Sequence, residues 1–180
     1  MANLMGDNFF EGEVGPGQAV FNNVDLGLTI NNIEIERVPM YKEIMKAQYG
    51  AMMDDKVQIG EYWRIKITIA EINYTKMAAW NPGVTLSGAG TAAKFGDQMY
   101  KSFRSNYAKI LQIKRTDADG TVSADSGYIL TFPKAIPGHP SEPYTVGPED
   151  QRVVDIEFHV LKDHTNNIYA YCGYASSLGL

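Results

Sequence analysis

The chain has 180 residues, of which 44% are hydrophobic and 21% charged, and its formal net charge is −5. This composition is that of an ordinary globular protein, which disfavours global disorder and fibrous low-complexity structure. The sixteen Lys and Arg residues form no basic run longer than Lys114-Arg115. Tight electrostatic binding to nucleic acid is therefore disfavoured, because such binding needs clustered cations.

The N-terminal segment 1–17 is rich in glycine and shows little periodicity, yet Phe9 and Phe10 stand side by side in it. It has no basic region followed by an apolar run, so we expect no signal peptide, and no later stretch approaches the roughly 18 apolar residues of a membrane span. We predict a flexible arm whose two rings dock on this subunit or a neighbour, because leaving each ring in water costs about 1.5–3 kcal/mol. Residues 18–180 are expected to form one β-rich domain.

The segment 18–38 predicts two strands around pairs of asparagines, the first at 22–23. Glu34 and Glu36 alternate with isoleucines, which gives one apolar and one acidic face. Pro39 is expected to end this element, because proline cannot donate a hydrogen bond to a strand ladder.

The segment 41–60 is ambiguous. Tyr41, Met45 and Tyr49 recur at four-residue spacing before Gly50, which favours a short helix and its C-cap over a strand. A polar linker through residues 54–56 is expected to follow and to end at Gly60.

The segment 61–71 is the clearest strand pattern, because Trp63, Ile65, Ile67 and Ile69 alternate strictly with other residues. After it, Asn73 or Thr75 can cap a short helix that ends at Trp80, since Asn81-Pro82 stops it. The next residues, 83–96, are rich in Gly and Ala and predict a loop.

Further strands are predicted at about 106–115, 127–132, 153–161 and 168–174, with a hairpin turn at Asp119-Gly120 and a proline-rich surface loop over 133–148. The third of these strands places Asp155 and Glu157 on its polar face. Strands without regular β-α alternation predict a mainly antiparallel β-sandwich or barrel with one or two short helices and long loops.

Candidate chemical motifs fail in their context. Residues 88–93 (GAGTAA) match a relaxed dinucleotide-binding fingerprint, but no adequate strand precedes them and Gly96 interrupts the helix that should follow. Asp117 and Asp119 lack the glutamate that a calcium loop requires. The three histidines and the single Cys172 do not pair at metal-ligand spacing. We predict no catalytic, cofactor or metal site, although a triad assembled from distant residues leaves no local motif.

Acidic residues mark the polar faces of two predicted strands. Glu34, Glu36, Asp155 and Glu157 could serve as paired acid–base carboxylates, but each lies where simple solvation suffices. Solvation does not explain why these faces favour acid over base.

Over roughly residues 20–80 the sequence resembles the major tail tube proteins of tailed bacteriophages. Each motif is short, and their order and spacing carry the resemblance: residues 24–29 (VDLGLT), 33–36 (IEIE), 48–50 (QYG), Asp55, 59–61 (IGE) and 65–71 (IKITIAE). In that family the segment equivalent to 41–49 is extended, which conflicts with the helix suggested by its spacing.

The resemblance implies a structural protein of the virion tail, assembled in the host cytoplasm. Such proteins form hexameric rings that stack into a hollow tube, and their sheets join around the ring and remove free edges. It implies assembly contacts through Phe9, Phe10, Tyr41, Tyr49, Met52 and Met53. It also implies a lumen lined by Glu34, Glu36, Asp155 and Glu157, past which DNA slides without specific binding, because like charge suppresses phosphate contacts.

Expected partners are other copies of the chain and tail proteins such as the tape measure, terminator and baseplate; a contractile sheath stays open. Three alternatives also stay open. One is another ring-forming tail component. The second is a monomeric β-sandwich that binds a ligand such as a carbohydrate, with Tyr62, Trp63, Trp80 or the C-terminal tyrosines as a stacking platform. The third is a small β-barrel hydrolase or isomerase.

Overall fold

The computed structural model describes residues 17–29, 33–46, 52–69, 73–81, 83–87, 92–95, 107–116, 121–122, 126–138 and 154–179. The strands are β1 (Gly17–Phe21), β2 (Val24–Leu28), β3 (Glu34–Lys46), β4 (Met52–Ile69), β5 (Val84–Ser87), β6 (Ala92–Phe95), β7 (Lys109–Arg115), β8 (Ile129–Pro137), β9 (Val154–Val160) and β10 (Tyr171–Cys172). One α-helix, α1 (Tyr74–Trp80), and 3-10 turns at Ser126–Tyr128 and Ala175–Leu178 complete the described elements. The predicted mainly antiparallel β fold is confirmed.

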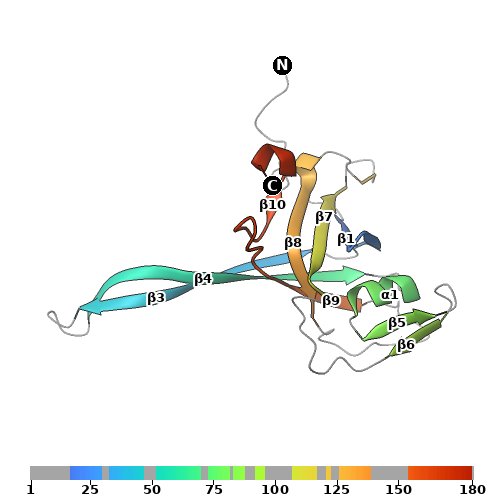
Figure 1. The fold of residues 1–180 in the computed structure, drawn as a ribbon, viewed down its shortest axis with the longest axis horizontal. Helices are drawn as coiled ribbons and strands as arrows, with labels where there is room; N and C mark the ends of the chain where they lie inside the picture. The colour runs from blue at the N-terminus through green and yellow to red at the C-terminus, as the bar shows by residue number, and fades with distance from the viewer. Residues whose placement is uncertain are drawn as a thin grey trace, which may run out of the picture.

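Eight of the described strands form one open antiparallel sheet in the order β2-β1-β7-β8-β9-β4-β3, with β10 added beside β8. The sheet curls, because an isolated bridge between Thr29 and Ile69 brings the end of β2 to the end of β4. The body of the protein is this curled sheet, and the β3–β4 hairpin projects far beyond it (Figure 1).

The core lies on the inner side of the curled sheet. Strand β9 shows the origin of this packing, since Val154, Ile156, Phe158 and Val160 are buried and alternate with more exposed residues. This is the period-two pattern that the sequence predicted for the strand. Phe158 meets Phe21 of β1 with ring centroids 5.0 Å apart, so distant parts of the chain share one core.

The β1–β2 hairpin turns at Asn22 and Asn23, as the sequence predicted. Both residues have positive φ angles, 50° and 63°, which a two-residue hairpin turn of this hand requires and which asparagine tolerates better than most residues. The Asp25 carboxylate then accepts a hydrogen bond from the Gly27 backbone N–H at 2.7 Å, which fixes the following strand.

The predicted helix is also confirmed. The Asn73 side chain accepts a hydrogen bond from the backbone N–H of Lys76 at 2.8 Å and caps α1, and Asn81 follows its last residue. The loop predicted over 83–96 is wrong in part, because β5 and β6 form a small antiparallel sheet there. Residues 88–91, with the first residues of the dinucleotide-like motif, lie outside the described residues.

Two further predictions need correction, and a third is confirmed. The proline-rich loop over 133–148 is wrong at its start, because residues 133–137 continue β8. The last predicted strand shrinks to β10, and Ile168 instead forms an isolated bridge with Asp163. The predicted pairing of the strands around 106–115 and 127–132 is confirmed by β7 and β8; the hairpin tip at Asp119-Gly120 lies outside the described residues.

Candidate functional site

The dominant surface feature is an arm, which we define as residues 38–46 of β3 and 52–62 of β4. Strand β4 pairs with β9 only from Trp63 onward, so within the arm it pairs with β3 alone. The resulting hairpin leaves the body as a two-stranded ribbon (Figure 1). Register shifts at Met40/Tyr41 and Ile44/Met45 mark bulges, which bend and twist a ribbon of this kind.

This arm corrects the reading of residues 41–60. The helix over 41–49 is wrong for residues 41–46, which belong to β3, and this agrees with the extended segment that the family resemblance implied. The linker ending at Gly60 is wrong too, since residues 52–60 are part of β4. Pro39 does not end its strand. It pairs opposite Glu61, where it is tolerated because β3 is an edge strand of the described sheet.

The arm exposes large apolar side chains to solvent. Six of the ten large hydrophobic residues recorded as exposed in the described part of the chain lie on it: Met40, Tyr41, Ile44, Val57, Ile59 and Tyr62. Ile59 is the most exposed of them, at 64%. Scattered exposed apolar residues are ordinary on a protein surface, whereas a concentration of them on one element calls for an explanation.

Glu61 anchors the root of the arm. Its carboxylate accepts hydrogen bonds from the Arg37 guanidinium at 2.8 and 2.6 Å, from the Trp63 indole N–H at 3.1 Å and from the Gln58 amide at 3.3 Å. Burial alone would raise the pKa of Glu61, but the Trp63 and Arg37 hydrogen bonds and the Arg37 charge outweigh it and lower that pKa. The cluster therefore stabilises the ionised form of Glu61.

The four carboxylates expected in a lumen come together on one face. Lys66 pairs opposite Glu34 on one side and Glu157 on the other, while Thr68 pairs opposite Asp155. Residues that pair directly across antiparallel strands point to the same side of the sheet, and Glu36 follows from the alternation of β3. We call this the charged face: Glu34, Glu36, Arg64, Lys66, Asp155 and Glu157. His159 pairs opposite Arg64 at the border of this face, with its Nε2 atom 3.3 Å from Glu157 Oε1.

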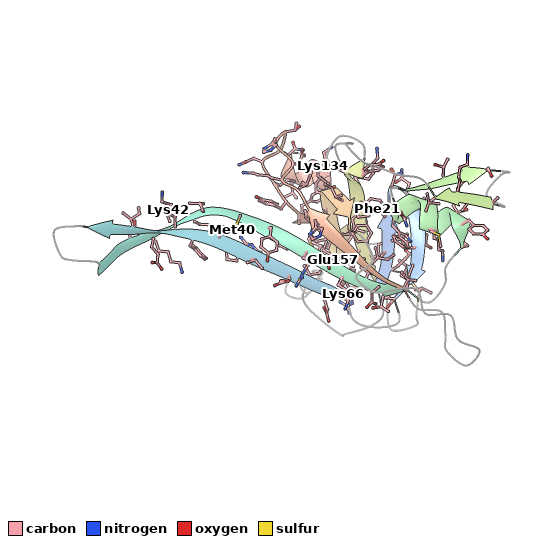
Figure 2. All side chains as sticks on the ribbon, turned by 90° about the horizontal axis from the view of Figure 1, so that it is seen from below. Phe21, Met40, Lys42, Lys66, Lys134 and Glu157 are labelled. Carbon is pink, nitrogen blue, oxygen red and sulfur yellow. The ribbon has the colours of Figure 1, made fainter. Side chains whose placement is uncertain are left out.

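The charged face lies at the base of the arm. A shallow groove of about 320 Å³ runs over it, lined by five of its six residues, all except Asp155. In Figure 2, Lys66 and Glu157 lie together there, whereas Met40 and Lys42 lie farther out along the arm. The alternation of residues 61–71 already put Arg64 and Lys66 on one side of a strand. Sequence reasoning did not assign them to this face because it could not place that strand between the two acidic strands, β3 and β9.

The residues predicted as assembly contacts fall in three groups. Tyr41 is exposed on the arm, with the Lys56 ammonium 4.4 Å from its ring centroid. Met52 and Met53 begin β4 at the far end of the arm, and only their backbone is described. The third group, Phe9, Phe10 and Tyr49, lies outside the described residues. The structure thus brings three of the six onto one element.

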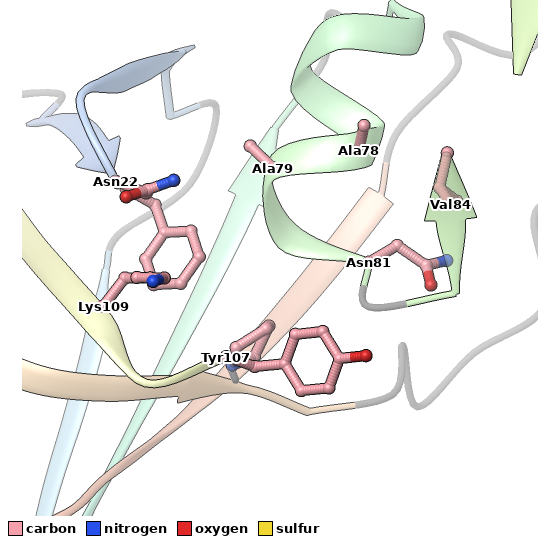
Figure 3. A pocket seen from close by; sticks show the side chains of 9 residues that line it. Asn22, Ala78, Ala79, Asn81, Val84, Tyr107 and Lys109 are labelled. Carbon is pink, nitrogen blue, oxygen red and sulfur yellow. The ribbon is translucent and has the colours of Figure 1, made fainter. Parts of the chain in front are cut away.

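A second hollow lies away from the charged face. A pocket of about 200 Å³ lies between α1 and the start of β7, lined in part by Asn22, Ala79, Tyr107 and Lys109 (Figure 3). Ligand pockets are usually larger, about 300–1,000 Å³. No group of three His, Cys, Asp or Glu residues among those described could hold a metal ion. No described helix has the length and apolar character needed to cross a membrane.

No protein-family model matches the chain, and no curated protein matches it. Among solved structures, its fold is similar to a chain of the sheath–tube complex of an extracellular contractile injection system, PVC, in the extended state. That match has 13% identity and a TM-score of 0.48 and covers 83% of this chain and 87% of the other. A second similarity, to the tube-terminating cap of the anti-feeding prophage, has 13% identity and a TM-score of 0.49 and covers 88% and 94%. At these values the similarity concerns the fold alone.

Proposed function

We propose that this chain is a structural subunit that assembles into hexameric rings, which stack into a hollow tail tube through which DNA is ejected. It has no catalytic role. The observation that carries the proposal is the arm, in which residues 52–62 of β4 and 38–46 of β3 project from the body and expose apolar side chains. An isolated monomer gains nothing from such an element, whereas a subunit that docks its arm on neighbouring copies does.

The energetics favour burial of the arm against a large surface. These side chains are 43–64% exposed, so burying the remainder of each contributes about half of the 1.5–3 kcal/mol of a fully exposed side chain, or roughly 1 kcal/mol. An obligate assembly interface of about 2,000 Å² or more accommodates several such residues at once. The neighbouring copies of the chain, in the same ring and in the next ring, are the occupants that we propose.

The edge of β3 supports ring formation. β3 stands at one end of the sheet order, and no described strand covers its outer side. A long uncovered edge is an aggregation hazard unless another strand pairs with it. Continuation of the sheet from one subunit to the next removes that edge. If the charged face of each subunit turns inward, the joined sheet lines the lumen with Glu34, Glu36, Asp155 and Glu157.

The same account defines the partners and the location. The ends of a stack of rings need a terminator and a baseplate, and a tape measure occupies its lumen before DNA does. The assembled particle is a virion tail or a related injection particle. We propose no specific DNA binding, because the excess of carboxylates on the charged face repels phosphate.

A matched pair of variants tests the arm. Ile59→Glu places a charge on the arm, and Ile110→Glu makes the same change on β7, at a residue that is also exposed (52%). Loss of one buried isoleucine costs about 2 kcal/mol or more per contact, so Ile59→Glu should weaken association at least tenfold. Sedimentation velocity over a concentration series measures this. Equal effects of the two variants, or none from Ile59→Glu, would contradict an arm-mediated assembly.

The N-terminal segment receives a separate test. Deletion of residues 1–16, with Phe9 and Phe10, should leave a folded body that no longer makes long tubes, which circular dichroism and electron microscopy report together. Gly17 is kept because it is the first residue of β1. Normal polymerisation of the truncated chain would show that these residues are not assembly contacts. Single rings that never stack in the full chain would instead indicate a cap or terminator.

A further inference from the structure

The charged face is not uniformly acidic, because two cations stand within it. The side chains of Arg64 and Lys66 are 48% and 40% exposed, which would allow either to reach a phosphate group. Exposed Arg and Lys side chains provide nearly all of the sequence-independent affinity of proteins for DNA. A surface past which a polyphosphate must slide therefore needs a means of occupying these two groups.

Each cation is held by a carboxylate. The Arg64 guanidinium donates to Glu36 Oε2 from Nε at 2.8 Å and lies within 2.5 Å of it through Nη2. The hydrogen bond to Glu36 and the Glu36 charge also raise the pKa of Arg64. The Lys66 ammonium lies 3.3 Å from Asp155 Oδ2. Asp155 is only 20% exposed and accepts a hydrogen bond from the Thr68 hydroxyl at 2.5 Å, so its carboxylate is held in place before Lys66 reaches it.

The sheet itself explains why cations are present. Lys66 pairs opposite Glu34 and Glu157, and Arg64 pairs opposite Glu36. Like charges directly across a strand pair destabilise a sheet, whereas opposite charges stabilise it. Replacing Lys66 or Arg64 with a neutral residue would leave carboxylates of β3 and β9 without a counter-charge on the strand between them.

We infer that Glu36 and Asp155 mask Arg64 and Lys66 from polyphosphates such as duplex DNA, while Glu34 and Glu157 leave the face with net negative charge. The two cations offset the repulsion between carboxylates of neighbouring strands, and the carboxylates keep these cations from binding phosphate. This inference deepens the proposed function and rests on it for one point, namely that the charged face lines a channel. The masking itself is a property of one chain and can be measured without assembly.

The test compares full-length variants, kept below their assembly concentration, on phosphocellulose and with fluorescein-labelled duplex DNA. The masking carboxylates are removed in Glu36→Gln/Asp155→Asn. A control, Glu43→Gln/Asp55→Asn, makes the same net charge change at exposed residues of the arm and leaves both ion pairs intact. A third variant removes the cations as well, by adding Arg64→Gln and Lys66→Gln to the first. Exposed ion pairs contribute little to stability, and thermal unfolding confirms that each variant is folded.

The first variant should be retained on phosphocellulose and should bind DNA, with a log–log salt dependence of about −2 for two new phosphate contacts. The wild-type chain, the charge control and the third variant should flow through. Equal retention of the first variant and the charge control would overturn the inference, because net charge alone would explain it. Retention that survives removal of Arg64 and Lys66, or no retention at all, would also overturn it. If the variants show masking but the chain forms no rings, the proposed function is contradicted and the inference of masking still holds.

Discussion

Replacing Glu61 with glutamine should loosen the root of the arm without changing the shape of the side chain. The Glu61 carboxylate accepts hydrogen bonds from Arg37, Trp63 and Gln58, and its side chain is only 12% exposed. Hydrogen bonds to a charged group are worth about 1.5–3 kcal/mol, but Arg37 is largely in solvent, where such a pair contributes about 0–1 kcal/mol. Glutamine keeps one acceptor oxygen. We therefore expect Glu61→Gln to lower the free energy of unfolding by about 1–2 kcal/mol at pH 7.

The pH dependence gives this prediction a second readout. The pKa of Glu61 in the folded chain lies below its ordinary value of 4.5, so the ionised group stabilises the fold. That contribution is fully present above pH 4.5 and is lost as the pH falls through the lowered pKa of the folded state. The difference between wild type and Glu61→Gln should be largest at neutral pH and should shrink in acid.

Urea unfolding at a series of pH values between 7 and 3 measures both effects. Glu43→Gln is the matched control, since Glu43 is an exposed acid elsewhere on the arm and its replacement should change the free energy of unfolding by less than about 0.5 kcal/mol. A Glu61→Gln variant as stable as wild type at pH 7, or a difference that does not shrink in acid, would refute the role given to this carboxylate.

Two smaller predictions concern the body. Gly138→Ala should lower the free energy of unfolding, measured in urea, by about 1–3 kcal/mol. A Cβ at this position would lie 3.0 Å from the Glu157 carbonyl oxygen, which belongs to the backbone and cannot move aside as a side chain would. An unchanged urea midpoint would show that the chain just after β8 relaxes freely. Asn73→Ala should cost about 1 kcal/mol through loss of the α1 cap, while Asn73→Ser retains most of it; equal losses from both would contradict a capping role.

The sequence predicted β4 and β9 best where one face of the strand is buried and the other is not. The inner halves of β4 and β9 alternate cleanly because Ile65, Ile67 and Phe158 are buried while the residues between them meet solvent or the charged face. The turn at Asn22-Asn23 and the cap at Asn73 were predictable for a different reason, since both depend on local chemistry alone.

The arm was not predictable by the same reasoning. Both of its faces are exposed at residues 41–44 and 55–59, so burial imposes no alternation there. Its two bulges lie on β4, where Ile59 and Asp54 are skipped in the pairing. On β3, Tyr41 and Met45 are four residues apart, a spacing that puts both on one face of a strand as well as of a helix, so the spacing did not distinguish the two. Only the family resemblance indicated an extended segment.

The charged face was predictable in part. The polar side of each strand could be read from its alternation, and all four predicted carboxylates lie on the face that the structure assembles. The ion pairs of Arg64 with Glu36 and of Lys66 with Asp155 depend on β3, β4 and β9 being neighbours. Strand order in a sheet is set by long-range packing, so no local pattern reveals it.

Negative-stain electron microscopy of the purified full-length chain at high concentration tests the central claim most directly. The account predicts hollow rings whose mass is about six times the 19.9 kDa chain, stacked into tubes with a central channel. A monodisperse monomer that shows neither rings nor tubes at any concentration would contradict it.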